Sequence, residues 1–358
     1  MSDSSGGSNI VVETTQRILR DRCTPALVNE AERGEFPAAL WETLEESGLT
    51  LAWVPDEFGG AGAEIADGFG ALRAAGEHAL PLPLAETMMA GFLLARAGIA
   101  CPAGPMTVAP VHAADAVQVG ADGTLQGSAR LVPFARWAGH LAVPARRGGE
   151  ACVALVALAD CAVKPGQSLA GEPRDGVVLH GVRPLELAAA PGLDADALGV
   201  LGAAVRAVQM AGGLERTLNM ALEHAVTRVQ FGRPIGGFQV IQHALAQFAG
   251  ESAAAGAAAD AAAEAIAAGA ALTDAEVVAE VAAAKIRVGE AAGVGAAIAH
   301  QVHGAMGFTY ELSLHQVTRR LWTWRDEFGG EAAWSIRLGG IAARAGADAL
   351  WPLVTGTH

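Results

Sequence analysis

The chain has 358 residues, of which 52% are hydrophobic and 17% are charged, and its net charge is −14. This composition supports a large buried core and argues against a disordered chain. The acidic balance, together with the lack of any local basic patch, excludes a nucleic-acid surface. A prior of roughly 150 residues per domain predicts two or three domains.

The cysteines and the apolar segments limit the kinds of site and location to expect. None of the four cysteines forms a CxxC pair or stands at metal-ligand spacing with a histidine, so no metal site is expected. Reduced thiols are typical of a cytoplasmic protein, and the N-terminus lacks the pattern of a secretory signal. The Ala-rich stretch 252–272 contains Asp260 and Glu264, which favours a buried or subunit-packed helix over a membrane span.

The chain changes character twice, which predicts three domains. Residues 1–108 have helical periodicity, with Gly and Pro turns between the helices. Residues 109–190 have β-branched residues in short runs between turns, which indicates a small β domain. Residues 191–358 are helical again and rich in Ala, so we expect long antiparallel helices in a four-helix bundle. The expected fold class is α+β, mostly α.

Turn residues separate the expected bundle helices. The first long helix should break at Gly232–Pro234, within the stretch RVQFGRPIGGFQ at 228–239. Thr273, followed three residues later by Glu276, has the spacing of a capping box and predicts the start of the third helix. The break at 228–239 is richer in Arg, Gln and aromatic residues than a turn between core helices requires.

Several stretches, taken with this domain order, closely resemble the acyl-CoA dehydrogenase family. They are RVQFGRPIGGFQVIQHALAQFA, LWETLEESGLTLAWVPDEFGGAG, AGEHALPLPLAETMMAGFLLARAG and HQVHGAMGFTYELSLHQVTRRL. The likeness covers both helical domains and is weak across the β domain. It implies a flavoprotein of fatty acid metabolism that takes an α proton and a β hydride from an acyl-CoA thioester. A carboxylate removes the proton, and FAD accepts the hydride.

The resemblance implies which residues hold the cofactor. In the family, the Arg of Arg-x-x-Phe-Gly contacts the FAD pyrophosphate of the neighbouring subunit, and Arg228 stands at that position. A guanidinium suits this role because it is always charged and can donate two parallel hydrogen bonds to phosphate. Gln230 and Phe231 would flank the same cofactor, with Gln239 nearby. Three of them have an alternative role: Arg228 as an ordinary surface arginine at a helix end, Phe231 as a core aromatic, and Gln239 as a residue that caps or pairs within the bundle.

A second segment resembles the turn that cradles the neighbour's FAD in the family. It comprises Gln301, His303, Gly304 and Ala305, and Ala305 replaces a Gly of the family pattern. A Gly in this turn lets the backbone approach the cofactor closely. His303 is equally well explained as a packed turn residue. His224 and His243 are interpreted as helix-face residues without a special role.

The sequence departs from the family where the catalytic base should stand. Counted without gaps from Arg319–Arg320, the usual Glu falls on Phe328, so that Glu327 is one residue early and Glu331 three late. In some members the base lies instead on the first bundle helix, and here that position is Gly202. Neither standard base is present, which leaves Glu331 and Glu327 as weak catalytic candidates.

The β domain departs from the family in the same sense. Where members contact their own flavin, this chain reads MTVAPVHAADAV and VPFARWAGHLA, without the expected hydroxyl-bearing residues. Trp137 is a possible remnant, although a packed aromatic role explains it better. The residues that would serve a subunit's own flavin are thus missing, whereas those that would serve a partner's flavin remain.

Three hypotheses follow from this pattern. In the first, the chain resembles the small, base-lacking subunit of heteromeric acyl-CoA dehydrogenases and assembles with a second, dehydrogenase-like subunit. In the second, it is a self-sufficient homodimer or homotetramer that uses Glu331 or Glu327 as its base. In the third, it is a flavin-free scaffold that kept the fold and lost the chemistry. The acyl chain of the substrate stays open under all three.

Overall fold

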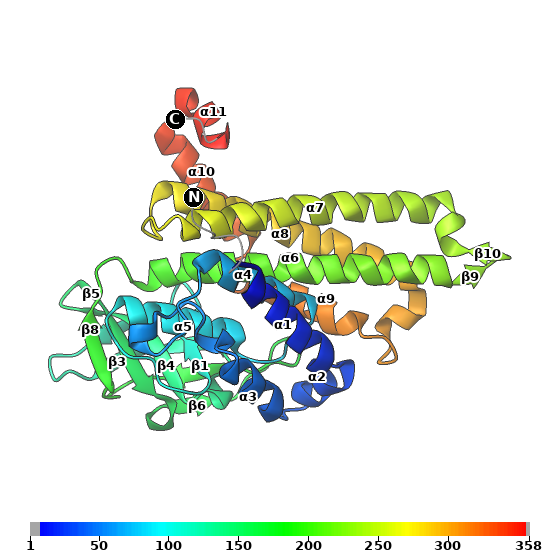
Figure 1. The fold of residues 1–358 in the computed structure, drawn as a ribbon. Helices are drawn as coiled ribbons and strands as arrows, with labels where there is room; N and C mark the ends of the chain where they lie inside the picture. The colour runs from blue at the N-terminus through cyan, green and yellow to red at the C-terminus, as the bar shows by residue number, and fades with distance from the viewer. Residues whose placement is uncertain (1–7, 356–358) are drawn as a thin grey trace.

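The computed structural model describes residues 8–355, and its helices and strands follow the order expected for an α+β, mostly α protein. The ends of the two predicted helical domains, 1–7 and 356–358, lie outside the described residues. The N-terminal helices are α1 Ser8–Arg22, α2 Pro25–Glu32, α3 Ala38–Glu46, α4 Ile65–Glu77 and α5 Leu84–Arg96. They wrap one side of the molecule in the blue and cyan part of Figure 1.

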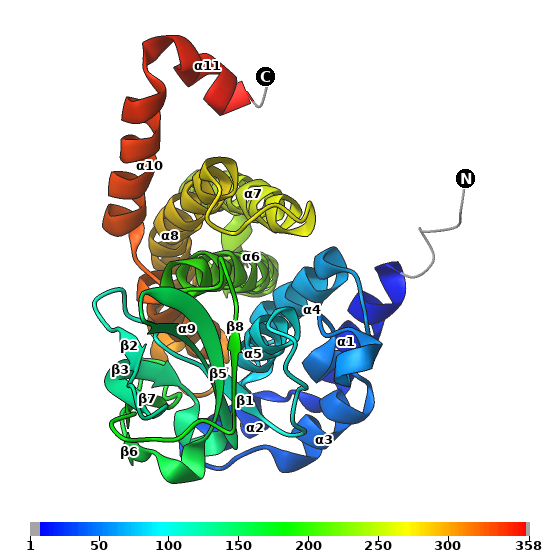
Figure 2. The ribbon, with the colours of Figure 1, turned by 90° about the vertical axis from the view of Figure 1, so that its left-hand side faces the viewer.

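A twisted mixed sheet follows. Its strands are β1 Met106–Val108, β2 Val117–Val119, β3 Leu125–Pro133, β4 His140–Arg147, β5 Glu150–Ala157, β6 Ala162–Lys164, β7 Arg174–Val178 and β8 Glu186–Ala189. The strand order is β6-β7-β3-β2-β4-β5-β8, and β1 adds to β4 in parallel. The sheet lies against α5 on one side and below α6, as Figure 2 shows. The buried apolar side chains of the β domain form one cluster. A larger cluster joins the N-terminal helices, including α5, to the bundle.

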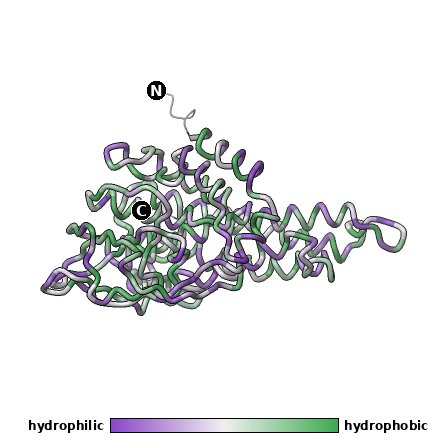
Figure 3. The backbone as a smooth tube through the Cα atoms, turned by 90° about the horizontal axis from the view of Figure 1, so that it is seen from below, coloured by the Kyte–Doolittle hydropathy of each residue, from purple (hydrophilic) through white to green (hydrophobic). Residues whose placement is uncertain are grey.

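The bundle is built from long helices that return at short turns. Its elements are α6 Ala195–Thr227, the strands β9 Val229–Gln230 and β10 Arg233–Pro234, α7 Gln239–Ala267, α8 Ala275–His303 and α9 Leu314–Asp326. Two further helices, α10 Glu331–Ala345 and α11 Ala347–Thr355, project beyond α7 and α8 (Figures 1 and 2). The β9–β10 hairpin marks one end of the bundle, which extends from the body of the protein in Figure 3.

Two details of the bundle helices bear on the sequence expectations. The sequence predicts that the capping box at Thr273 opens α8, but the N-cap is Asp274, one residue later. No side-chain hydrogen bond caps the helix. Among the described residues, α6 alone is long and apolar enough to cross a bilayer, but 94% of its most apolar window is buried inside the protein. This burial is the pattern of a core helix in a globular protein.

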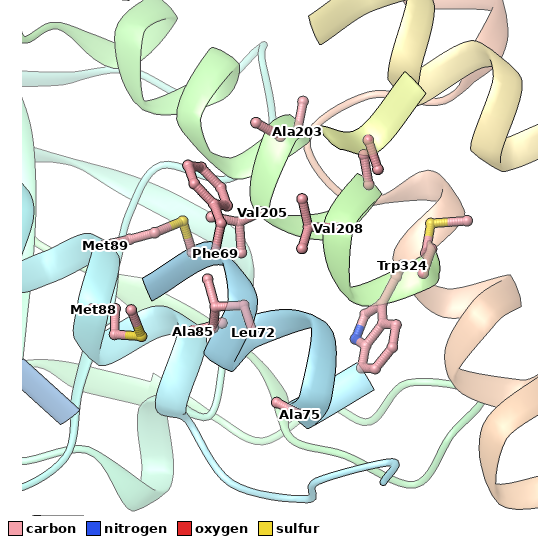
Figure 4. Close-up of a cluster of buried hydrophobic side chains, with 14 of the residues drawn as sticks. Phe69, Leu72, Ala75, Ala85, Met88, Met89, Ala203, Val205, Val208 and Trp324 are labelled. Carbon is pink, nitrogen blue, oxygen red and sulfur yellow. The ribbon is translucent and has the colours of Figure 1, made fainter. Parts of the chain in front are cut away.

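The first bundle helix, α6, also lies in the larger apolar core, which joins the N-terminal helices to the bundle. Figure 4 shows Val205 and Val208 of α6 among Phe69 and Leu72 of α4, with Met88 and Met89 of α5 beside them. The packing is close enough that Gly76 of α4 has no room for a methyl group. A Cβ on Gly76 would lie 1.9 Å from the backbone oxygen of Gln209 on α6. The N-terminal helices and the bundle therefore form one continuous core.

Replacing Gly76 with Ala should force α4 and α6 apart and lower the free energy of unfolding by about 1–3 kcal/mol, because backbone cannot move as a side chain can. Gly199 of α6 is the matched control, since a Cβ there would meet nothing within 4 Å. Gly199→Ala should be neutral or stabilising by up to about 1 kcal/mol, because Ala is the better helix former. Urea unfolding of the two variants measures both effects, and equal stabilities would contradict the close contact.

Candidate functional site

A buried network of charged side chains lies where the N-terminal helices, the sheet and the bundle meet. Its centre is Glu327, which directly follows α9. Glu327 Oε2 accepts a hydrogen bond from Arg206 Nε at 2.7 Å, and Oε1 accepts one from Arg174 Nε at 2.5 Å. Arg206 lies on α6 and Arg174 on β7, and both are almost fully buried. Both oxygens of the Glu327 carboxylate are therefore occupied by arginines.

The charges around Glu327 decide its protonation. Burial by itself would raise the pKa of the Glu327 carboxyl, but the guanidinium groups of Arg174 and Arg206 outweigh burial and hold the pKa below its ordinary value. Arg206 also pairs with Glu86 of α5 and donates to Gln209 Oε1 at 2.6 Å. A carboxylate with a lowered pKa and two charged partners is poorly suited to accept a proton from a substrate.

The network continues outward from Arg174 with alternating charge. Arg174 contacts Glu172 at 2.9 Å, and Glu172 contacts Arg320 of α9 at 2.8 Å. Arg320 in turn reaches Glu32, the last residue of α2, at 3.0 Å. Each positive group thus has a negative neighbour, and the chain of charges joins α2, the sheet and α9.

Phe328 and Gly202, the two positions where the family carries its base, are in contact. An ideal Cβ built on Gly202 would lie 2.4 Å from Cδ1 of the Phe328 ring. The ring is 5% exposed, and the backbone of Phe328 has a left-handed φ of 54°. Trp334 of α10 donates from Nε1 to the Phe328 carbonyl oxygen at 3.0 Å, which holds this turn in place. Only a residue without a side chain at 202 leaves space for the ring.

The remaining space beside this contact is small and mostly apolar. A pocket of about 300 Å³ lies between the loop that follows β1, the start of α6 and α10. Its lining includes Val111, His112, Gly199, Phe328, Trp334 and Arg337. Arg337 makes two hydrogen bonds of 2.8 Å to the carboxylate of Asp196. No carboxylate in this lining is free of a cationic partner, because Asp196 is the lining's one acidic residue.

The other base candidate, Glu331, opens α10. Its carboxylate pairs with Arg325 near the end of α9, and its side chain is 21% exposed. Glu331 packs over Gly289 of α8, where a Cβ would lie 2.2 Å from Oε1. The pairing fixes the carboxylate between α8, α9 and α10, so Glu331 is also engaged within the protein.

The two stretches of the β domain that stand where family members contact their own flavin have side chains engaged within the protein. Thr107 of β1 is fully buried, and its hydroxyl donates to the Pro133 carbonyl oxygen at 2.6 Å. Trp137 packs between Phe134 and Phe36, with ring centroids 5.7 and 5.5 Å away. These two side chains are therefore packing groups of the β domain.

All eight residues that the sequence suggests for cofactor binding lie at the end of the bundle marked by the hairpin. Arg228 caps the C-terminus of α6, Gln230 lies on β9, Phe231 occupies the hairpin turn and Gln239 begins α7. All four are exposed, and Phe231 is 93% exposed. Phe231 lies in a left-handed turn, at φ 51°, and is a surface residue, not a core aromatic.

The second segment approaches the first through a pair of histidines. The rings of His303 on α8 and His224 on α6 stack with centroids 4.4 Å apart. Burial lowers the pKa of His224, and the charges of His303 and Arg228 lower it further. Gln301, Gly304 and Ala305 are exposed beside this pair. His303 itself is buried, so the expected turn exists and His303 supports it by packing.

His224 is the residue that sequence reasoning missed. It was interpreted as an ordinary helix-face residue, but it joins the end of α6 to the end of α8. Its stacking partner is far away in the sequence, so no local pattern signalled the contact. His243 has no such role and is exposed on α7.

Apolar side chains surround this end of the bundle. Five of the exposed large hydrophobic residues there are Val226, Val229, Val240, Phe308 and Tyr310. Exposed apolar patches of this kind are typical of surfaces that another protein covers. No group of histidine, cysteine and acidic residues suited to a metal ion occurs in residues 8–355.

Comparison with known proteins shows which family the chain belongs to. Residues 8–100 match the acyl-CoA dehydrogenase N-terminal domain, and residues 200–325 match the acyl-CoA dehydrogenase C-terminal domain. Acyl-CoA dehydrogenase IpdE2 of Mycobacterium tuberculosis is 30% identical over 312 residues, which are 86% of this chain and 88% of that protein.

Solved structures share the fold. A chain of the ChsE4–ChsE5 complex from Mycobacterium tuberculosis superposes with a TM-score of 0.84 at 24% identity, covering 97% of this chain and all of that one. A chain of the Tcur3481–Tcur3483 steroid ACAD gives a TM-score of 0.82 at 23% identity, covering 94% of this chain and 98% of that one. The protein belongs to the acyl-CoA dehydrogenase family, whose members are oxidoreductases that act on CH–CH groups.

Proposed function

We propose that this chain is the non-catalytic subunit of a mixed acyl-CoA dehydrogenase. In the assembly it would hold, through the end of its bundle, an FAD that lies mainly in the partner subunit. The partner would supply the base for α,β-desaturation of an acyl-CoA thioester. The observation that carries this proposal is the packing of the Phe328 ring on Gly202, which leaves neither family position with a carboxylate.

The engagement of the two nearby glutamates supports the same proposal. Glu327 is held between two buried arginines and Glu331 is paired with Arg325, so neither is free to act as a base. The exposed Arg228 supports the other half of the proposal, since it has no ion-pair partner among the described residues. A guanidinium left unpaired at an exposed, apolar-rimmed surface fits a phosphate brought by a partner.

The roles of this chain's residues follow from their chemistry. FAD, when bound, supplies the acceptor for the substrate's hydride. Arg228 would bind the diphosphate through paired N–H donors, and Gln230 would add a neutral donor beside it. Phe231, with its exposed ring, would cover the cofactor and exclude water. The similarity to the Tcur3481–Tcur3483 steroid ACAD makes a steroid-derived thioester the first substrate to test. A cytoplasmic location accords with the free cysteines.

A flavin count per chain tests the proposal. The chain purified alone should carry little FAD, whereas co-expression with a base-bearing dehydrogenase chain from the same genome should give a flavin-loaded complex. In that complex, Arg228→Ala should weaken FAD binding by about 10–100-fold, because a charge-assisted phosphate contact is lost. Arg216, an exposed arginine elsewhere on α6, is the matched control and should be neutral when replaced by Ala.

Two results would contradict the proposal. Full FAD occupancy and turnover by the chain alone would support a self-sufficient enzyme. Unchanged FAD affinity in the Arg228→Ala complex would instead support a flavin-free scaffold.

A further inference from the structure

The hairpin at the end of the bundle has a register that places its polar side chains together. Gln230 of β9 pairs with Arg233 of β10 across the two-residue loop Phe231–Gly232. Both loop residues have positive φ, 51° and 80°, as the type I′ turn of a tight hairpin requires. The Ile235 N–H donates to the Arg228 carbonyl oxygen at 2.9 Å, so the same register extends back to the end of α6.

This register divides the hairpin into two faces. Directly opposed residues share a face, and so do residues two apart along one strand. Arg228, Gln230 and Arg233 therefore lie on one face, and Val229 and Pro234 lie on the other. All three polar residues are exposed. One face of the hairpin thus carries two arginines with an amide between them.

Arg233 is held in place without being neutralised. Its guanidinium carbon lies 4.2 Å from the centroid of the Phe238 ring, and its side chain passes over Gly237, where a Cβ would lie 3.5 Å from Cδ. The Phe238 ring also makes an edge-to-face contact with the Phe231 ring, with the ring centroids 6.1 Å apart. No acidic residue pairs with Arg233 within the described residues 8–355. Within the same residues its N–H donors also make no hydrogen bond to a carbonyl or amide oxygen, although the Phe238 ring already orients them.

We infer that Arg233 is a second binding residue for the diphosphate of the partner-held FAD, acting beside Arg228. The inference rests on the proposed function, because it assumes that this face meets the cofactor. Two guanidinium groups on one face match a ligand with two linked phosphates, and Gln230 can donate between them. Stacking on Phe238 reduces the side-chain freedom that Arg233 loses on binding.

The test is FAD titration of the flavin-stripped complex of this chain with its partner, at low and high salt. Arg233→Ala should weaken FAD binding by about tenfold, as loss of one charge-assisted contact predicts. It should also reduce the salt dependence of the Kd, since screening acts on the charge that has been removed. Arg233→Lys should keep most of the salt dependence while losing part of the affinity, because the charge stays and the planar fork is lost.

The outcomes separate this inference from the proposed function. If Arg228→Ala weakens binding and Arg233→Ala changes neither affinity nor salt dependence, Arg233 plays no part and only the inference is overturned. If Arg233→Ala lowers affinity but leaves the salt dependence unchanged, Arg233 acts by shaping the hairpin, which also overturns it. If neither variant weakens FAD binding, the proposed function fails as well. Arg216→Ala serves again as the control and should match the unmodified complex.

Discussion

Replacing Glu327 with Gln should lower the free energy of unfolding by about 3–5 kcal/mol, which is the usual cost of removing one partner from a buried ion pair. The amide keeps the shape of the side chain but not its charge. Arg174 and Arg206 would then be buried without their shared carboxylate. Arg206 would keep Glu86 as its one acidic partner, and Arg174 would keep Glu172. Urea unfolding, followed by circular dichroism, measures the loss.

Glu331 provides the matched control for Glu327. Its ion pair with Arg325 is partly exposed, with side chains 21% and 40% accessible, so Glu331→Gln should cost less than about 1 kcal/mol. The same two variants, assembled with the partner subunit, also test the catalytic alternative. A Glu327→Gln complex that unfolds normally but loses at least about 10²-fold in turnover would identify Glu327 as a base and contradict its structural role.

Lys285 should make the stability of the protein depend on pH above neutrality. Lys285 lies on α8, and its side chain is buried. Its Nζ donates to the carbonyl oxygens of Trp324 and Arg325 on α9 at 2.8 and 2.7 Å. Burial lowers the pKa of Lys285 to about 7, although the charges of Glu327 and Glu331 oppose the shift. The shift from 10.5 corresponds to a free-energy cost on the order of 5 kcal/mol for keeping this buried amine charged.

The sign of the pH effect follows from proton linkage. Between pH 7 and the ordinary lysine range, the unfolded chain holds a proton on Lys285 that the folded protein has released. Stability due to this group therefore rises with pH across that window. Relative to Lys285→Met, the unmodified protein should gain about 2 kcal/mol between pH 7 and pH 8.5. Thiol titration affects both proteins equally and cancels in the difference.

The chain's one other lysine supplies the control for Lys285. Lys164 is exposed on β6, so the stability difference between the unmodified protein and Lys164→Met should stay constant with pH. A difference for Lys285→Met that is equally flat would mean that the buried amine stays protonated throughout. In that case, its pKa would be close to the ordinary value despite its burial.

The tight contact between Phe328 and Gly202 shows how two sequence departures can have one structural cause. In the sequence they are separate losses, one in the turn after α9 and one in the middle of α6. In the structure the ring at one position fills the space left at the other. Core positions in contact must change together in volume, because protein interiors are closely packed.

The sequence by itself predicted the α+β, mostly α fold class and the family, and both are confirmed. The fold class could be predicted because helix periodicity, strand alternation and turn residues act over short windows of chain, whereas the family came from the resemblance of whole stretches. It also grouped the residues at the end of the bundle, since RVQFGRPIGGFQ is a continuous stretch. The start of α8 was misplaced by one residue, because Thr273 and Asp274 are both good N-cap residues.

Only the tertiary structure decided what the glutamates do and how the two cofactor-like segments meet. Glu327 cannot be recognised as an ion-pair centre from its neighbours, because its partners lie on β7 and α6. His224 finds His303 only when α6 and α8 lie side by side. The physical reason is common to both: burial and charge pairing depend on distances through space, and residues far apart in the chain are brought together only by the packing of the helices and the sheet.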